Sequence, residues 1–184
     1  KEMAEQRKYT RTTKSAVKSK PVDEYGHLQP QAIDFEEAVL GALMIEKDAY
    51  SIVSEILRPE SFYDHKHQLL YKAITTLAMR QQPIDILTVA EQLRSTGELE
   101  EAGGPFYITQ LSGKVASSAH IEYHARIIAQ KFLARELITF TSNIQTKAFD
   151  ATQDVDDLMQ EAEGKLFEIS QKNMKKDYTQ INPV

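Results

Sequence analysis

From residue 34 onward, apolar residues recur at the 3.6-residue spacing of an amphipathic α-helix, and this periodicity constrains the fold more than any other feature of the chain. The first such segment, "DFEEAVLGALMIE", gathers five apolar residues on one helix face: Phe35, Val39, Leu40, Leu43 and Met44. No segment shows the clear alternation of apolar and polar residues that marks a half-buried strand. The sequence therefore predicts an all-α fold, with a small helical globule followed by a long antiparallel helical hairpin.

Start and stop signals divide residues 30–114 into four short helices and a helical turn, which form the predicted globular subdomain. Pro59 ends the second helix, because the residue before a proline is disfavoured in the α region. Asp85 is the expected N-cap of the fourth helix, and Gly97 is the expected left-handed residue after its end. The double glycine at 103–104 opens the last short segment.

Two longer helices follow within residues 115–171, and only the four residues "DATQ" connect them. So short a link permits an antiparallel hairpin and little else. Ser117 or Ser118 is the expected cap of the first helix, and Asp154 is the expected N-cap of the second.

The first of these two helices carries apolar residues around more than one face, and an isolated hairpin buries only one face. The rest must meet the globule or another subunit. Burial by a partner is favoured, because large exposed apolar patches are rare on monomers. This surface is predicted to be a dimerisation interface, and its candidate residues repeat at helical intervals on both helices: Leu133, Leu137, Ile144, Ala148, Val155, Leu158, Ala162, Leu166 and Ile169.

Charge is distributed unevenly along the chain. Residues 1–20 contain seven Lys or Arg and two Glu, whereas the whole chain has a net charge of −5. Residues 1–29 are expected to be a disordered basic arm, since they lack an apolar face that could offset their ordering entropy. Such an arm attracts phosphates, but the acidic body behind it repels a DNA backbone. Weak DNA binding or none is therefore expected.

The absence of cysteine excludes disulfides and thiolate metal sites. No apolar run approaches the roughly 20 residues that cross a bilayer, and the start lacks the apolar block of a signal peptide. A cytoplasmic protein without a membrane partner is therefore expected.

Gly113 and Lys114 resemble part of a phosphate-binding loop, but the rest of the motif is missing. Ile108 stands where that loop needs its first glycine, and Val115 stands where it needs a hydroxyl residue for magnesium. The preceding "TGELEEA" is also not a buried strand. This pair is therefore interpreted as a helix end.

The remaining candidates for catalysis or metal binding are equally incomplete. His120 and His124 have the i, i+4 spacing of zinc ligands without a third ligand, and His65 and His67 flank Lys66 as a pair only. His67 is interpreted as a packing or capping residue. The carboxylate pairs 36–37, 100–101 and 156–157 lie in first turns or loops, where the helix dipole and solvent favour acids. No catalytic residue, cofactor or metal is expected, and the chain reads as an interaction module.

Five segments, in order and spacing, resemble the N-terminal domain of bacterial replicative DNA helicases of the DnaB type. They are "EEAVLGALMI" (36–45), "LRPESFYDHKHQLLYKAI" (57–74), "QPIDILTVAEQLRSTGEL" (82–99), "AGGPFYITQLS" (102–112) and "SSAHIEYHARIIAQKFLARELI" (117–138).

The resemblance implies a non-catalytic collar on a hexameric ring that unwinds DNA at the replication fork. In that family the domain pairs through its hairpin and docks primase, and a helicase loader is a further possible partner. ATP and Mg belong to a C-terminal ATPase domain, to which residues 172–184 are expected to begin the linker. Enzyme activity of this segment itself stays open. The alternative is a free-standing helical adaptor or regulator with a basic nucleic-acid-binding arm.

Three positions depart from the usual pattern of the family. Ala32 stands where a Ser or Asn cap is frequent, so the first helix is expected to begin at Asp34 instead. Gln82 replaces a frequent glycine and Ala116 a frequent proline. These changes affect helix boundaries and not the family resemblance.

Overall fold

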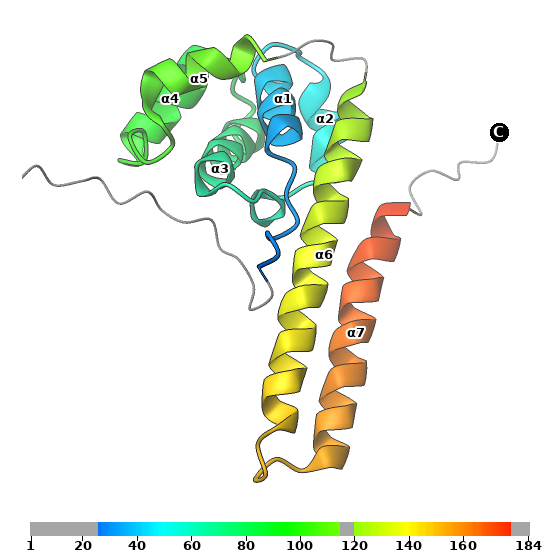
Figure 1. Ribbon diagram of the computed structural model, residues 1–184. Helices are drawn as coiled ribbons and strands as arrows, with labels where there is room; N and C mark the ends of the chain where they lie inside the picture. Colours follow the sequence, from blue (N-terminus) through cyan, green and yellow to red (C-terminus); the bar gives the residue numbers. More distant parts are fainter. Residues whose placement is uncertain (1–25, 115–119, 178–184) are drawn as a thin grey trace, which may run out of the picture.

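The computed structural model describes residues 26–114 and 120–177, with side chains as far as residue 173, and the regular elements of this part of the chain are helices. The predicted all-α fold is confirmed. In chain order the elements are α1 (Ile33–Leu43), α2 (Ala49–Ser54), the 3-10 helix η1 (Pro59–Ser61), α3 (His65–Met79), α4 (Ile86–Ser95), α5 (Gly104–Ser112), α6 (Ile121–Ala148) and α7 (Val155–Asp177). The first six elements form a globule, and α6 and α7 run antiparallel beside it (Figure 1).

Two predicted helix caps are present as expected. The Asp85 carboxylate accepts from the backbone N–H of Leu87 and Thr88, both at 2.9 Å, and the Thr88 hydroxyl accepts from the Asp85 N–H at 2.9 Å. This capping box satisfies donors that the first turn of α4 leaves free. Gly97 follows the end of α4 with a φ of +74°, a conformation that glycine adopts without strain.

Asp154 caps α7 in the same manner, accepting from the N–H groups of Asp156 at 2.9 Å and Asp157 at 3.1 Å. The predicted caps Ser117 and Ser118 lie outside the described residues, within which α6 begins at Ile121.

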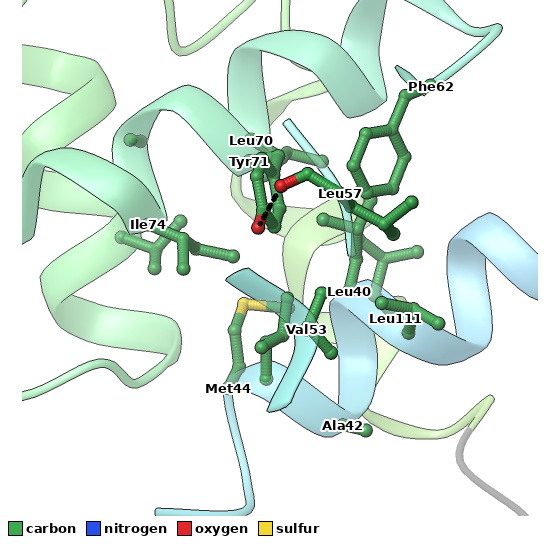
Figure 2. Packing of buried hydrophobic residues seen from close by; sticks show 14 of the residues in the cluster. Leu40, Ala42, Met44, Val53, Leu57, Phe62, Leu70, Tyr71, Ile74 and Leu111 are labelled. Atoms are coloured by element: carbon green, nitrogen blue, oxygen red, sulfur yellow. Dashed lines mark hydrogen bonds between the residues drawn. The ribbon is translucent and has the colours of Figure 1, made fainter. Parts of the chain in front are cut away.

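Two helix boundaries differ from the expectation. The helix α1 begins at Ile33, one residue before Asp34, and its N-cap Ala32 makes no side-chain hydrogen bond. The helix α2 ends at Ser54, well before Pro59, because the next residues leave the helix to bury Leu57 in the core. The Leu57 carbonyl then accepts from the Tyr71 hydroxyl at 3.2 Å (Figure 2). Tertiary packing therefore ends α2 before the proline does.

The core of the globule surrounds α1, which contacts α2, α3, α5 and α6. Figure 2 shows Leu40, Val53, Leu70 and Ile74 converging on one another from α1, α2 and α3. All four side chains are fully buried. Truncating a buried Leu or Ile of this kind to Ala costs about 2–5 kcal/mol.

The first part of α6 belongs to this core. Ile121, Ala125 and Ile128 are buried with the side chains of α1 to α5, whereas the C-terminal half of α6 extends past the globule and contacts α7 (Figure 1). The helix is 28 residues long and contains neither Gly nor Pro. The globule and the hairpin therefore share one continuous helix.

A buried polar network ties three helices together within the globule. The Glu36 side chain, 1% exposed, accepts from the Tyr63 N–H at 2.7 Å, and its Oε2 lies 2.6 Å from Nδ1 of His67, which is completely buried. The other ring nitrogen of His67 lies 2.6 Å from the Tyr107 hydroxyl on α5. Burial raises the pKa of Tyr107, so its hydroxyl stays protonated and donates to Glu37 at 3.3 Å.

The interpretation of Glu36 as a solvated first-turn acid is therefore wrong. It does lie in the first turn of α1, but its carboxylate points into the protein, where three donors replace water. His67 was expected to pack or to cap, and it is a fully buried packing residue, since Asp64 is the N-cap of α3.

Replacing Glu36 with Ala should lower the free energy of unfolding by about 3 kcal/mol or more, because His67 and the Tyr63 N–H would stay buried without their acceptor. The measurement is denaturant unfolding followed by circular dichroism. Glu46→Ala is the matched control: this exposed glutamate follows α1 closely, and its loss should change stability by less than about 0.5 kcal/mol. Equal midpoints for the two variants would show that the network contributes nothing.

Candidate interfaces on the helical hairpin

Arg135, on α6, fixes the hairpin to the globule. Its Nη1 donates to the Pro30 carbonyl at 2.7 Å and its Nη2 to the Ser61 carbonyl at 2.8 Å. The guanidinium also lies over the rings of Tyr63 and Phe132, at 5.4 and 5.6 Å from their centroids. Partial burial lowers the pKa of Arg135, which nevertheless stays charged as arginines do in proteins. The planar group thus holds the segment before α1 and the 3-10 helix η1 against α6.

The nine candidate interface residues divide into three groups by exposure. Leu158 and Ile169 are buried, at 7% and 4%, and α7 uses them to pack on α6. Leu133, Ile144 and Ala162 are half-buried. The four exposed members are Leu137, Ala148, Val155 and Leu166. The structure therefore leaves the last two groups at least partly accessible to solvent and places Leu158 and Ile169 inside the hairpin.

Several large apolar side chains of the hairpin that the sequence interpretation did not select are also exposed, and three of those that follow Arg135 are more than half exposed. They are Phe149 at 83%, Phe167 at 65% and Met159 at 56%. Met159 lies four residues after Val155 and so on the same face of α7, a spacing that is visible in the sequence. Phe149 caps the end of α6, outside any periodic pattern, and no sequence signal shows that it is exposed.

A groove of about 630 Å³ lies between α6 and α7. Its apolar lining comes mainly from Phe132, Phe140 and Ile144 of α6, with Ile169 of α7. Three glutamates also line it: Glu136, Glu161 and Glu168. Lys147 of α6 pairs with Glu161 of α7 across the hairpin, although an exposed pair of this kind contributes little to stability. The groove offers apolar surface beside carboxylates, which suits a binding surface better than a catalytic one.

The histidines and the Gly-Lys pair do not form a chemical site. His65 pairs with Glu101 at 2.9 Å, and His124 packs edge-on against Phe35 with ring centroids 5.2 Å apart. The Lys114 ammonium lies 3.0 Å from a carboxylate oxygen of Glu37, with which it forms an ion pair. Within the described residues, no group of three or more His, Asp or Glu side chains could hold a metal ion.

Across the described ranges 26–114 and 120–177, no helix is both long enough and apolar enough to cross a lipid bilayer.

The described chain is an all-α globule that shares one long helix with an antiparallel hairpin, and the hairpin carries exposed apolar side chains. The family of the DnaB-like helicase N terminal domain matches residues 28–130. The chain belongs to this family.

Relatives and solved structures agree with this assignment. The chain is 43% identical to the replicative DNA helicase DnaB of Rhodothermus marinus over 86% of its own length, and 37% identical to the replicative DNA helicase DnaC of Bacillus subtilis over 85%. It covers only 17% and 35% of those two proteins. The crystal structure of the N-terminal domain of DnaB helicase from Mycobacterium tuberculosis is similar, with a TM-score of 0.71 and 34% identity over 76% of this chain and 98% of that one.

A second similar structure is a DnaB-like replicative helicase studied for its interactions with primase. Its TM-score is 0.61, and the identity is 28% over 74% of this chain and 30% of that one.

Arg135→Lys should keep the charge on α6 but lose the planar fork that reaches two carbonyls at once. The expected result is a loss of about 1–2 kcal/mol in the free energy of unfolding, measured by denaturant titration. Arg94→Lys is the control, because this arginine is exposed on α4 and pairs only with the nearby Glu91 within the described residues. An Arg135→Lys variant as stable as the control would mean that the fork does not hold the hairpin.

Proposed function

We propose that this chain is the N-terminal collar domain of a replicative DNA helicase, a protein that unwinds DNA at the replication fork. Its role is non-catalytic: it supports assembly of a hexameric ring through pairing of hairpins, and it docks primase. Membership of the family supports the first part of this proposal. The observation that carries the pairing role is the exposed apolar face of α7, formed by Val155, Met159 and Leu166.

These three side chains lie on one stripe of α7, since residues four and seven apart share a helix face. They are 70%, 56% and 47% exposed in the single chain. On α6, Leu137 is also exposed, and Ile144 is half-buried. Two hairpins that packed these faces together would form a four-helix bundle, in which apolar area leaves water on both sides.

The other partners of this proposal follow from the relatives. Primase is supported by the similar helicase whose interactions with primase were studied. A helicase loader is a further proposed partner, which rests on the family resemblance alone. ATP and Mg are assigned to a separate ATPase domain of the full-length helicase, and DNA is bound weakly or not at all by this part. The work of such a helicase lies in the bacterial cytoplasm. A free-standing helical adaptor is not favoured, given the family.

The first experiment places a charge on the proposed pairing face. Leu166→Glu should weaken self-association at least a hundredfold, because pairing would bury an unpaired carboxylate at a cost of about 3 kcal/mol or more. Sedimentation over a range of concentrations measures the effect. The globule should keep its helical circular dichroism signal, since its core does not include Leu166.

Leu87→Glu is the matched control, because it makes the same chemical change at an exposed position on α4 of the globule. It should leave the mass in solution unchanged. If Leu166→Glu retains the wild-type association, or if both variants lose it equally, the assignment of α7 to the pairing face is wrong.

A second experiment tests the docking of primase. A bacterial primase mixed with this chain should form a complex that is detected by a change in sedimentation, and a monomeric chain carrying Leu166→Glu should bind more weakly if the primase contacts a paired collar. Should no primase from several bacteria bind at tens of micromolar, the docking role would have to be withdrawn.

A further inference from the structure

On α7, the groove and the exposed stripe of Val155, Met159 and Leu166 lie on different sides of the helix, whereas on α6 both surfaces include Ile144. On α7 the groove is lined by Gly164, nine residues after the exposed Val155. Nine residues of α-helix correspond to a rotation of about 900°, which places Gly164 roughly opposite Val155 on the helix. A Cβ at Gly164 would meet no atom within 4 Å, so the groove is open beside it. Pairing through Val155 therefore leaves the α7 side of this groove accessible.

The part of the hairpin around the groove is strongly acidic. Residues 136–168 contain eight Asp or Glu and two Lys, a net charge of −6. Lys147 pairs with Glu161, and Lys165 and Lys172 pair with Glu168, but all of these side chains are substantially exposed. Glu136 also lines the groove, and within the described residues it has no ion-pair partner. An ionised carboxylate has about four acceptor positions, so each glutamate retains room for another donor.

The N-terminal end of the chain has the complementary composition, and the described residue Pro30, which follows it, lies beside this groove. Residues 1–20 contain seven Lys or Arg and two Glu, a net charge of +5. Arg135 holds the Pro30 carbonyl at 2.7 Å, and its neighbours in the same turns of α6, Phe132 and Glu136, line the groove. The chain thus passes the wall of the groove only ten residues after its basic segment ends.

The distances permit the basic segment to reach the groove of its own molecule. The groove extends along α6 from Phe132 to Ile144, about 18 Å of helix. The ten residues 21–30 can span up to about 33 Å when extended, and the twenty residues of the basic segment can span over about 60 Å. A short tether of this kind gives an effective concentration on the order of millimolar, so that weak charge-assisted contacts suffice for occupancy.

We propose that residues 1–20 bind in cis along the groove between α6 and α7, with their lysines and arginines on the glutamates at its rim. The apolar side chains interspersed among these charges, Met3, Tyr9 and Val17, match the apolar lining of Phe132, Phe140 and Ile144. In the bound segment, the glutamates of the groove neutralise the lysines and arginines. The groove therefore competes with nucleic acid for these cations. This inference does not depend on the proposed helicase role.

The absence of cysteine from the chain provides a direct test by disulfide trapping. In the full chain, Thr10→Cys is combined with Asn143→Cys, which lines the groove, or with Ser170→Cys, an exposed position of α7 outside both the groove and the pairing face. Dilute oxidation followed by mass spectrometry measures how fast an intramolecular disulfide forms. The groove pair should react at least tenfold faster than the control pair, and 1 M NaCl should abolish the difference.

Two further variants separate binding from proximity. Gly164→Leu places an apolar side chain at the groove, where a Cβ meets no atom within 4 Å, and it favours the helix, so it should slow trapping of the groove pair to the control rate while the helical signal is retained. Replacing Arg7, Lys8 and Arg11 together with Gln should do the same. Equal rates for the two pairs, or a groove pair insensitive to Gly164→Leu, would overturn the proposal. Disulfide-linked dimers would assign the groove to a second copy's segment and overturn binding in cis.

Discussion

The globule depends on one buried carboxylate. Glu36 lies in the first turn of α1, yet it accepts hydrogen bonds from the loop before α3 and contacts His67 inside α3. Through His67 the network continues to Tyr107 on α5, and from there to Glu37 back on α1. Apolar contacts are tolerant of small rotations, whereas hydrogen bonds of 2.6 Å between buried groups are not. The network therefore fixes the relative orientation of three helices that apolar packing alone would leave less defined.

Much of the fold could be predicted from the sequence because its signals are local. Asp85, Gly97 and Asp154 act through the backbone within three residues, and the apolar stripes of α1 and α3 follow the helical period directly. The early end of α2 could not be predicted, because it results from the burial of Leu57 against Tyr71, fourteen residues away. The burial of Glu36 could not be predicted for the same reason, because its partners lie 27 and 31 residues later in the chain.

The hairpin shows a similar limit. Its existence follows from the short link and from two long periodic segments, but a stripe of apolar residues does not reveal which members face the neighbouring helix. Leu158 and Ile169 face α6, whereas Val155 and Leu166, on the same stripe, remain in water. The stripe spans about 100° of the helix circumference. One edge of it therefore packs on α6, and the other edge is exposed to solvent in the single chain. Only the position of α6 decides where that division falls.

The continuity of α6 has a mechanical consequence. One end of this helix is embedded in the core through Ile121, Ala125 and Ile128, and the other end carries the hairpin, with no glycine or proline between them that could serve as a hinge. Its 28 residues make a stiff rod of about 42 Å. The helix thus acts as a lever: Arg135 fixes its middle to the globule, and a tilt of about 10° about that point would move the end of α6, about 20 Å away, by about 3 Å. A small tilt of α6 within the globule is therefore passed along the helix to the end of the hairpin, and a displacement of the hairpin is passed back to the core.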